Sequence, residues 1–247
     1  MGVPETFKGI LNTARISVPT VVEATIGRLT PAQCDERLDW WSRTVLRDAD
    51  VDLVVRGREH AEGSQPFIVM SNHQSLYDIP VIFQSIPGRL RMVAKAELFR
   101  VPVWGQAMHA AGFIRVDRSN RRQAVASLRA GTSMLQEGTR VWIAPEGTRS
   151  RSGQLSAFKS GGFRMALETS TPILPVAIDG TRKVLPAKGF VVQRHQQVVV
   201  TVLPPVDPRR YGVERRKELM RDVRAAIAAA LGQDPAVEAK GVAATAG

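Results

Sequence analysis

The feature that most constrains the fold is the alternation of short apolar runs with amphipathic helical segments. Strand-like apolar runs occur at residues 51–55, 66–70, 141–143 and 172–178. Segments with apolar residues at helical spacing occur at residues 30–47, 120–135 and 214–231. Strands and helices that alternate in this way form a sheet with helices on its faces. The sequence therefore predicts an α/β fold with a largely parallel central sheet flanked by helices.

Three parts of the chain differ in composition. Residues 1–47 are predicted to form an N-terminal amphipathic helical segment, in which Pro19 separates two short helices and residues 30 and 31 begin a third. Residues 48–231 are predicted to form the α/β domain. Residues 232–247 are small and polar and are predicted to form a flexible tail. Two interpretations of the N-terminal helices stay open: they dock on a membrane, or they pack on the domain.

The net charge favours an anionic partner. The chain has 34 Lys and Arg against 23 Asp and Glu, a net charge of +11. Such a charge attracts nucleic acid, an acidic membrane surface or phosphorylated substrates. No apolar run reaches the roughly 18–20 residues of a membrane span, and no signal-peptide pattern occurs. We therefore expect a chain that does not cross a membrane. Because Cys34 is the single cysteine, we also expect a reducing compartment.

Residues 71–80, SNHQSLYDIP, follow a strand-like run and open a helical pattern. His73 and Asp78 are five residues apart, and at about 100° per residue a regular helix would point them in different directions. They meet only if His73 lies in an irregular turn before the helix. There Asp78 would hold one ring nitrogen, and His73 would act as a general base. The alternative is a half-buried structural histidine.

A second polar turn, residues 144–151, follows the run at 141–143. Gly147 allows a close backbone approach, Thr148 supplies a hydroxyl and Arg149 a planar cation, beside the carboxylate of Glu146. These groups suit an oxyanion or phosphate, although such turns are also common on surfaces. Lys159, close downstream, is a further candidate phosphate contact because of its charge. Ligands gather at the carboxyl ends of parallel strands, so one cleft can hold both turns.

Two further predictions concern the end of the sheet. The prolines within residues 172–178 favour the start of a strand or an edge strand. Residues 191–192 and 198–203 are predicted to form a hairpin.

Four sequence blocks resemble the glycerophospholipid acyltransferase family, most closely its 1-acylglycerol-3-phosphate acyltransferases. The blocks are NHQSLYD at 72–78, GFIRVDR at 112–118, PEGTRS at 145–150 and TPILPVAI at 171–178. Their order makes the resemblance specific within residues 71–180, whereas the rest of the chain is similar only in general terms.

The resemblance implies transfer of a fatty acyl group from acyl-CoA or acyl carrier protein to the free hydroxyl of 1-acylglycerol-3-phosphate (lysophosphatidic acid), giving phosphatidic acid. It implies that His73 is the base, that Asp78 orients it, and that no covalent acyl-enzyme forms. The residues implied to hold the glycerol phosphate are Arg118, Glu146, Gly147, Thr148 and Arg149. Pro175 belongs to the fourth block, which is linked more loosely to the acyl side.

The resemblance further implies no permanently bound cofactor; the acyl thioester is a substrate. We expect a peripheral, monotopic protein on the cytoplasmic face of the cell membrane, with an anionic membrane surface as a partner and acyl carrier protein as a second possible one.

Other functions stay open. One alternative is an acyltransferase whose acceptor is a lyso-aminolipid or another lysophospholipid. The other is an acyl-thioester hydrolase, in which water replaces the acceptor, although no G-x-S-x-G occurs. A nucleic-acid partner is not expected, because no RNA-binding signature or zinc-finger spacing is present. A metal is not expected either, because His60, His73, His109 and His195 share no ligand spacing.

Overall fold

The structure is a computed structural model that describes residues 3–117 and 121–236. Its α-helices are α1 (Val3–Thr25), α2 (Pro31–Asp48), α3 (Asp78–Ser85), α4 (Trp104–Ala110), α5 (Arg121–Gln136), α6 (Gly161–Thr169), α7 (Thr181–Val184) and α8 (Arg216–Ala230). Its strands are β1 (Asp52–Arg56), β2 (Ile68–Ser71), β3 (Leu90–Lys95), β4 (Ile114–Val116), β5 (Arg140–Ile143), β6 (Ile173–Asp179) and β7 (Gln197–Val202). Three 3₁₀ turns are η1 (Arg58–Ala61), η2 (Ala96–Arg100) and η3 (Pro208–Arg210).

The strands form one seven-stranded sheet in the order β1-β7-β6-β2-β5-β3-β4. All neighbouring pairs are parallel except β6 and β7, which are antiparallel. The predicted fold class, an α/β fold with a largely parallel sheet, is confirmed. The carboxyl ends of the adjacent strands β2, β5 and β6 lie at one edge of the sheet, where both polar turns begin.

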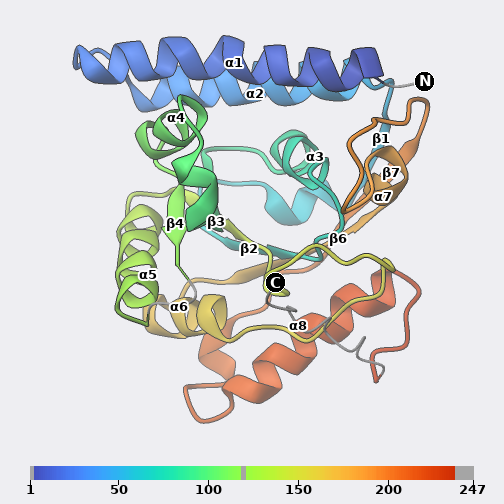
Figure 1. Ribbon diagram of the computed structural model, residues 1–247. Coiled ribbons are helices and arrows are strands. Elements are labelled where there is room, and N and C mark those ends of the chain that lie inside the picture. The colour runs from blue at the N-terminus through green and yellow to red at the C-terminus, as the bar shows by residue number, and fades with distance from the viewer. Residues whose placement is uncertain (1–2, 118–120, 237–247) are drawn as a thin grey trace.

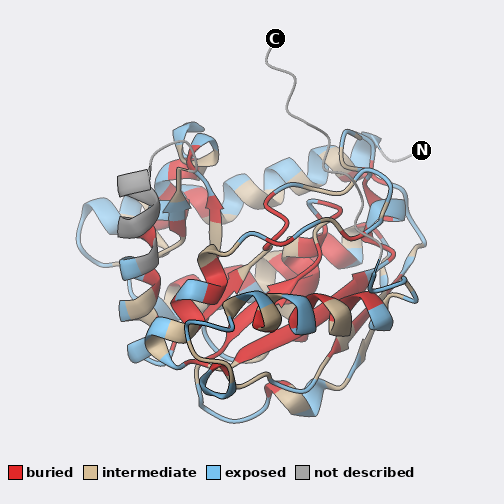
Figure 2. Ribbon diagram, turned by 90° about the horizontal axis from the view of Figure 1, so that it is seen from below, coloured by how far each residue is buried: buried red, intermediate tan, exposed pale blue. Residues whose placement is uncertain are grey.

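Helices cover both faces of this sheet (Figure 1). Helices α3 and α4 lie on one face with α1 and α2 beyond them, and α5, α6 and α8 lie on the other. Successive residues of β2 enter different cores, since Phe67 and Val69 join one buried cluster and Ile68 and Met70 the other. All four residues of β2 are therefore buried and the first three are apolar, as expected of a strand covered on both faces (Figure 2).

Helix α1 runs through Pro19 as one helix, so the predicted division into two short helices is wrong. Helix α2 lies along α1 (Figure 1) and holds it on both sides of the proline. The Trp41 indole donates to the Thr13 hydroxyl at 3.0 Å, and Arg37 donates to Thr20 at 3.0 Å and Glu23 at 2.7 Å. These contacts compensate for the backbone hydrogen bond that proline cannot make.

Helix α2 begins where the sequence indicates. The Thr30 hydroxyl accepts from the backbone of Gln33, whose side chain accepts from the backbone of Thr30, and Pro31 occupies the first turn. This capping box satisfies two donors that the first helical turn leaves open.

Pro175 lies in the middle of β6, a strand between β2 and β7, so the prediction that this run starts a strand or forms an edge is wrong. Its carbonyl accepts from the backbone N–H of Leu203, one residue past the end of β7, at 2.9 Å. The missing N–H of a proline points to the same side as its carbonyl, so it faces a position where the β7 ladder has already ended.

The predicted hairpin is also wrong. Residues 191–192 form no strand, and β7 pairs with β6 on one side and with β1 in parallel on the other. Within residues 3–117 and 121–236, none of the helices combines the length and the apolar character that crossing a bilayer requires.

Candidate active site

His73 and Asp78 meet in the irregular turn between β2 and α3. The Nδ1 atom of His73 lies 2.7 Å from Oδ2 of Asp78. The pair forms because α3 begins only at Asp78, so residues 72–77 are not helical. The imidazole keeps 20% of its side-chain surface exposed, whereas the Asp78 side chain is fully buried. The ring is therefore held from inside the protein and open to a ligand from outside.

Asp78 is surrounded by donors. Its Oδ2 accepts the backbone N–H groups of Gln74 at 2.7 Å and Ser75 at 2.9 Å, and the Thr181 hydroxyl donates to Oδ1. In all of these contacts the Asp78 carboxylate is the acceptor. Because a carboxylate only accepts, the Nδ1 of His73 carries the proton in this contact, and Nε2 is left as the basic atom.

Trp142 of β5 packs against the imidazole. The two rings meet edge to face, with centroids 6.3 Å apart and planes at 87°. The indole N–H is itself held, because it donates to the Ser71 hydroxyl at 2.9 Å. The plane of the His73 ring is thus fixed by an aromatic neighbour as well as by Asp78.

The turn at residues 144–150 grips the backbone of His73. The Oε1 atom of Glu146 accepts the His73 N–H at 2.8 Å, and the Ser150 N–H donates to the His73 carbonyl at 2.7 Å. The Oε2 atom accepts the Ser156 N–H at 3.0 Å and its hydroxyl at 2.7 Å. Burial raises the pKa of Glu146, against the opposing effect of the hydrogen bonds from Ser156 and His73.

This geometry suggests a role for Glu146 different from the predicted phosphate contact. Its side chain is buried, and both oxygens already receive protein donors. A carboxylate also repels a phosphate. Glu146 fastens the 144–150 turn to the backbone of His73.

The other predicted members of the turn lie beside this junction. Gly147 is buried with φ +78°, a left-handed conformation that favours glycine, and its N–H donates to the Ala144 carbonyl at 3.0 Å. Thr148 is exposed and Arg149 is half-buried. No acidic side chain of the described residues forms an ion pair with Arg149.

Three predicted residues remain, Lys159, Pro175 and Arg118. Lys159 is exposed, and its backbone N–H donates to the Pro145 carbonyl at 2.8 Å, which places its segment next to the turn. Pro175 is buried in the sheet. Arg118 lies outside the described residues.

An apolar cavity of about 480 Å³ adjoins the turn that carries His73 and Asp78, the dyad. This cavity was not predicted from the sequence. Leu76 and Tyr77, from the same turn as His73, form part of its wall. The remaining lining residues come mainly from α1, α2, α3 and α4, and include Ile10, Ala14, Leu38, Trp41, Phe83, Met92, Trp104, Ala107, Met108 and Phe113. A cavity of this size and polarity accepts a long hydrocarbon chain.

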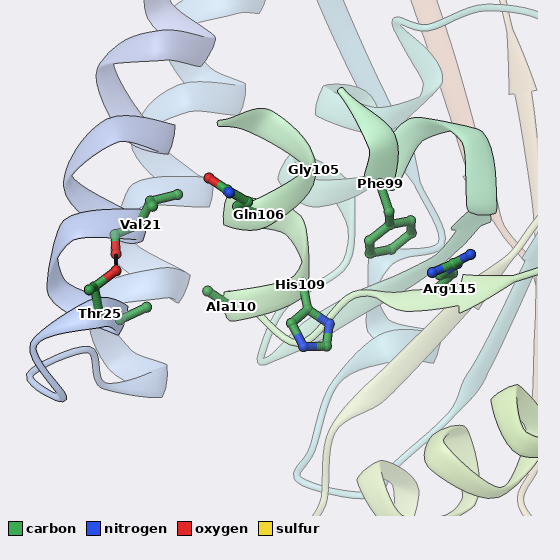
Figure 3. A pocket seen from close by; sticks show the side chains of 9 residues that line it. Val21, Thr25, Phe99, Gly105, Gln106, His109, Ala110 and Arg115 are labelled. Atoms are coloured by element: carbon green, nitrogen blue, oxygen red, sulfur yellow. Dashed lines mark hydrogen bonds between the residues drawn. The ribbon is translucent and has the colours of Figure 1, made fainter. Parts of the chain in front are cut away.

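A second cavity, of about 600 Å³, lies between the C-terminal part of α1 and helix α4 (Figure 3). Gln106 and His109 line it from α4, with Val21 and Thr25 opposite on α1 and Arg115 beyond. None of its lining residues belongs to the dyad or to the 144–150 turn. The first cavity, walled in part by Leu76 and Tyr77, is therefore the one that borders the turn between His73 and Asp78.

Sequence reasoning missed Thr181 and the anchoring role of Asn72. Asn72 donates to the Ile178 carbonyl and accepts the Ile178 N–H, both at 2.8 Å, which joins the end of β2 to β6. Thr181 lies two residues after the end of β6 and reaches Asp78 across the same edge of the sheet. A signal existed, because Thr181 is a hydroxyl residue close to the carboxyl end of a strand.

An α/β fold with a His–Asp pair beside an apolar cavity and a basic turn agrees with the acyltransferase class that the four sequence blocks indicate. The family model described as Acyltransferase matches residues 52–179. That match covers more than half of the 247 residues, and the chain belongs to the acyltransferase family.

Individual relatives agree with this assignment. The human 1-acyl-sn-glycerol-3-phosphate acyltransferase alpha is 35% identical over 162 residues, which are 63% of this chain and 55% of the human one. The 1-acyl-sn-glycerol-3-phosphate acyltransferase of Salmonella typhimurium is 32% identical over 166 residues, 67% of this chain and 66% of that one. The chain thus spans about half the length of the human relative and somewhat more of the bacterial one.

A solved structure is similar over nearly the whole chain. The 1-acyl-sn-glycerophosphate (LPA) acyltransferase PlsC from Thermotoga maritima superposes with a TM-score of 0.72 at 25% identity. The match covers 96% of this chain and 100% of that one. The similarity therefore extends beyond residues 52–179 to most of the N-terminal helices and the C-terminal part.

Proposed function

We propose that this chain transfers a fatty acyl group from acyl-CoA or acyl carrier protein to the free hydroxyl of 1-acylglycerol-3-phosphate, giving phosphatidic acid. The observation that carries the proposal is the 2.7 Å contact between His73 Nδ1 and Asp78 Oδ2, in a turn whose Leu76 and Tyr77 line an apolar cavity. The names of the human and Salmonella relatives support the choice of acceptor.

In this reaction the Nε2 atom of His73 takes the proton from the acceptor hydroxyl. The freed oxygen attacks the thioester carbonyl and forms a tetrahedral intermediate. The intermediate collapses with loss of the thiolate, and the imidazolium returns the proton to that sulfur. Asp78 stabilises the cation between these steps without moving a proton itself, because its carboxylate faces Nδ1. No covalent acyl-enzyme and no bound cofactor take part.

The phosphate of the acceptor binds at the 144–150 turn. Arg149 supplies a planar pair of donors, Thr148 a hydroxyl, and Lys159 a second cation from the adjacent segment. Arg118 is the remaining residue that we propose binds the phosphate. The cavity lined by residues such as Trp41, Phe83 and Met108 receives the fatty acyl chain.

The N-terminal helix supports a peripheral position on the cytoplasmic face of the membrane. Large apolar side chains of α1 remain exposed after folding: Val3, Phe7, Ile10, Leu11, Val18 and Val22. Lys8 and Arg15 are exposed on the same helix. An amphipathic helix with these features lies in the headgroup region of an anionic bilayer. That position brings the cavity to the lipid acceptor.

The test is to incubate the purified chain with lysolipids and acyl thioesters and to identify the product by mass. Lysophosphatidic acid with acyl-CoA or acyl carrier protein should give phosphatidic acid, and His73→Ala should give none above background. Acylation of a lyso-aminolipid instead would show that the acceptor is that lipid and not lysophosphatidic acid. Release of free fatty acid without acceptor would indicate a hydrolase.

A further inference from the structure

We propose that residues 186–192 form a lip that inserts into the surface of an anionic lipid bilayer at the entrance of the apolar cavity, with Phe190 as the inserting side chain. The lip is a second membrane contact in addition to α1. Its role in substrate entry rests on the proposed function, whereas its contact with lipid does not.

Phe190 is unusually exposed for its size. Its exposed fraction of 85% exceeds that of every other large apolar side chain in the part of the chain that the structure describes. The adjacent Val191 is 39% exposed. Two neighbouring apolar side chains at the tip of a connection have no core to fill, which is typical of a surface that meets an apolar partner.

The lip is fastened to the first turns of α1. The Thr6 hydroxyl donates to the Phe190 carbonyl at 2.9 Å and accepts the Val192 N–H at 3.2 Å. Figure 1 shows the orange segment between α7 and β7 beside the N-terminal end of α1. Phe7 on the next position of α1 is 62% exposed. A bilayer that receives the start of α1 therefore also meets Phe190.

The lip also borders the proposed reaction site. Leu185, immediately before the lip, and Val192, its last residue, line the apolar cavity together with Thr6. The hydroxyl of Ser75 donates to the Leu185 carbonyl at 2.7 Å. The backbone N–H of the same serine donates to Oδ2 of Asp78. One short segment thus connects the outer surface with the turn that carries the dyad.

Charge selects the partner. Residues 180–196 contain Arg182, Lys183, Lys188 and Arg194 and no Asp or Glu. Lys188 within the lip and Lys183 shortly before it are exposed, whereas Arg194 lies near Glu5 at 3.8 Å. A phenylalanine flanked by solvent-exposed lysines combines apolar insertion with attraction to anionic headgroups. This combination fits an anionic bilayer better than a second copy of a chain whose net charge is +11.

The experiment compares Phe190→Ser with Val213→Ser in the full chain. Val213 is 62% exposed, precedes α8 by a few residues and is the matched control, since α8 lies on the far side of the sheet from α1 (Figure 1). Partition onto phosphatidylglycerol-containing vesicles is measured by sedimentation. We expect Phe190→Ser to bind about tenfold more weakly and Val213→Ser to bind like the wild type. Lys188→Gln should weaken binding to these vesicles but not to phosphatidylcholine vesicles.

Insertion itself is measured with Phe190→Trp and Val213→Trp in vesicles whose lipids carry brominated chains. We expect additional quenching over the wild type for Trp at 190 and none for Trp at 213. Unchanged partition of Phe190→Ser, equal losses in both serine variants, or no quenching at 190 would overturn the proposal. So would a loss of self-association in Phe190→Ser with vesicle binding intact, because the partner would then be a second copy.

Neither readout depends on turnover. If the chain shows no acyl transfer but Phe190 still controls vesicle binding, the proposed function fails and the lip stands. If acyl transfer occurs and Phe190→Ser binds vesicles normally, the lip fails and the proposed function stands.

Discussion

The buried hydroxyl of Thr181 donates to Oδ1 of Asp78, across 103 positions of sequence. The contact brings the end of β6 to the turn after β2 and occupies the carboxylate oxygen that does not face His73. Thr181 acts through Asp78 and is therefore a positioning residue.

Thr181→Val should lower kcat about tenfold and leave KM for lysophosphatidic acid unchanged. The substitution keeps the shape but leaves one oxygen of a buried carboxylate without its donor, a loss on the order of 1–3 kcal/mol. Thr181→Ser restores the hydroxyl and should recover most of the rate. Steady-state kinetics of the three proteins test this, and a serine variant as slow as the valine variant would contradict it.

Glu146→Gln should lower kcat more than it raises KM for lysophosphatidic acid. An amide offers a single acceptor oxygen where the carboxylate binds His73 with one oxygen and Ser156 with the other. A variant whose only defect is a higher KM would show instead that Glu146 serves the phosphate.

The same variant should change the pH dependence of stability. Burial raises the pKa of Glu146 above its usual 4.5, so the folded protein binds more protons than the unfolded chain within the window above that value. This contribution to stability is full below the usual pKa and is lost as pH rises through the raised one. Denaturant unfolding from pH 4.5 upward should therefore show a wild-type decline that Glu146→Gln lacks. Parallel curves would contradict the burial effect.

Arg149→Ala should raise KM for lysophosphatidic acid about ten- to a hundredfold, because a charge-assisted bond to phosphate contributes about 1.5–3 kcal/mol. Arg149→Lys should lie between, since it keeps the charge without the planar pair of donors. Arg164→Ala, an exposed arginine on α6, is the control. An equal rise in KM for acceptors with and without a phosphate would exclude Arg149 as a phosphate contact.

Ala107→Leu should shift the preferred acyl donor toward shorter chains. Ala107 lines the apolar cavity from α4, so three added carbons reduce the space for the chain. Ala110→Leu on the same helix faces the second cavity and should leave the preference unchanged. Product masses from a mixture of acyl thioesters measure the effect, and an unchanged distribution with Ala107→Leu would place the acyl chain elsewhere.

The sequence predicts well those features that depend on local pattern. Alternating strand and helix patterns predict the parallel sheet, and the strand-to-helix turn at 71–80 predicts that His73 and Asp78 can meet. Predictions based on prolines were wrong here because the sequence pattern does not show which segments pack against each proline. Pro19 remains within a helix because α2 holds α1 on both sides, and Pro175 is tolerated where the β7 ladder ends.

Features that join distant segments are beyond local pattern. The apolar cavity requires α1 to lie over α3 and α4, with Thr6 and Val192 on one wall. Thr181 becomes important only after β6 is placed next to β2. Glu146 looks like a phosphate ligand in the sequence because the hydrogen bonds that engage it come from His73 and Ser156 in the folded chain.

The most direct test of the account is the turnover of His73→Ala with lysophosphatidic acid and an acyl thioester, beside the control His109→Ala in the second cavity. A positioned general base contributes about 10²- to 10⁴-fold. We expect His73→Ala to lose at least 10²-fold in kcat while its circular dichroism and unfolding midpoint stay close to those of the wild type, and His109→Ala to keep its rate. A folded His73→Ala protein that makes phosphatidic acid at the wild-type rate would contradict the account.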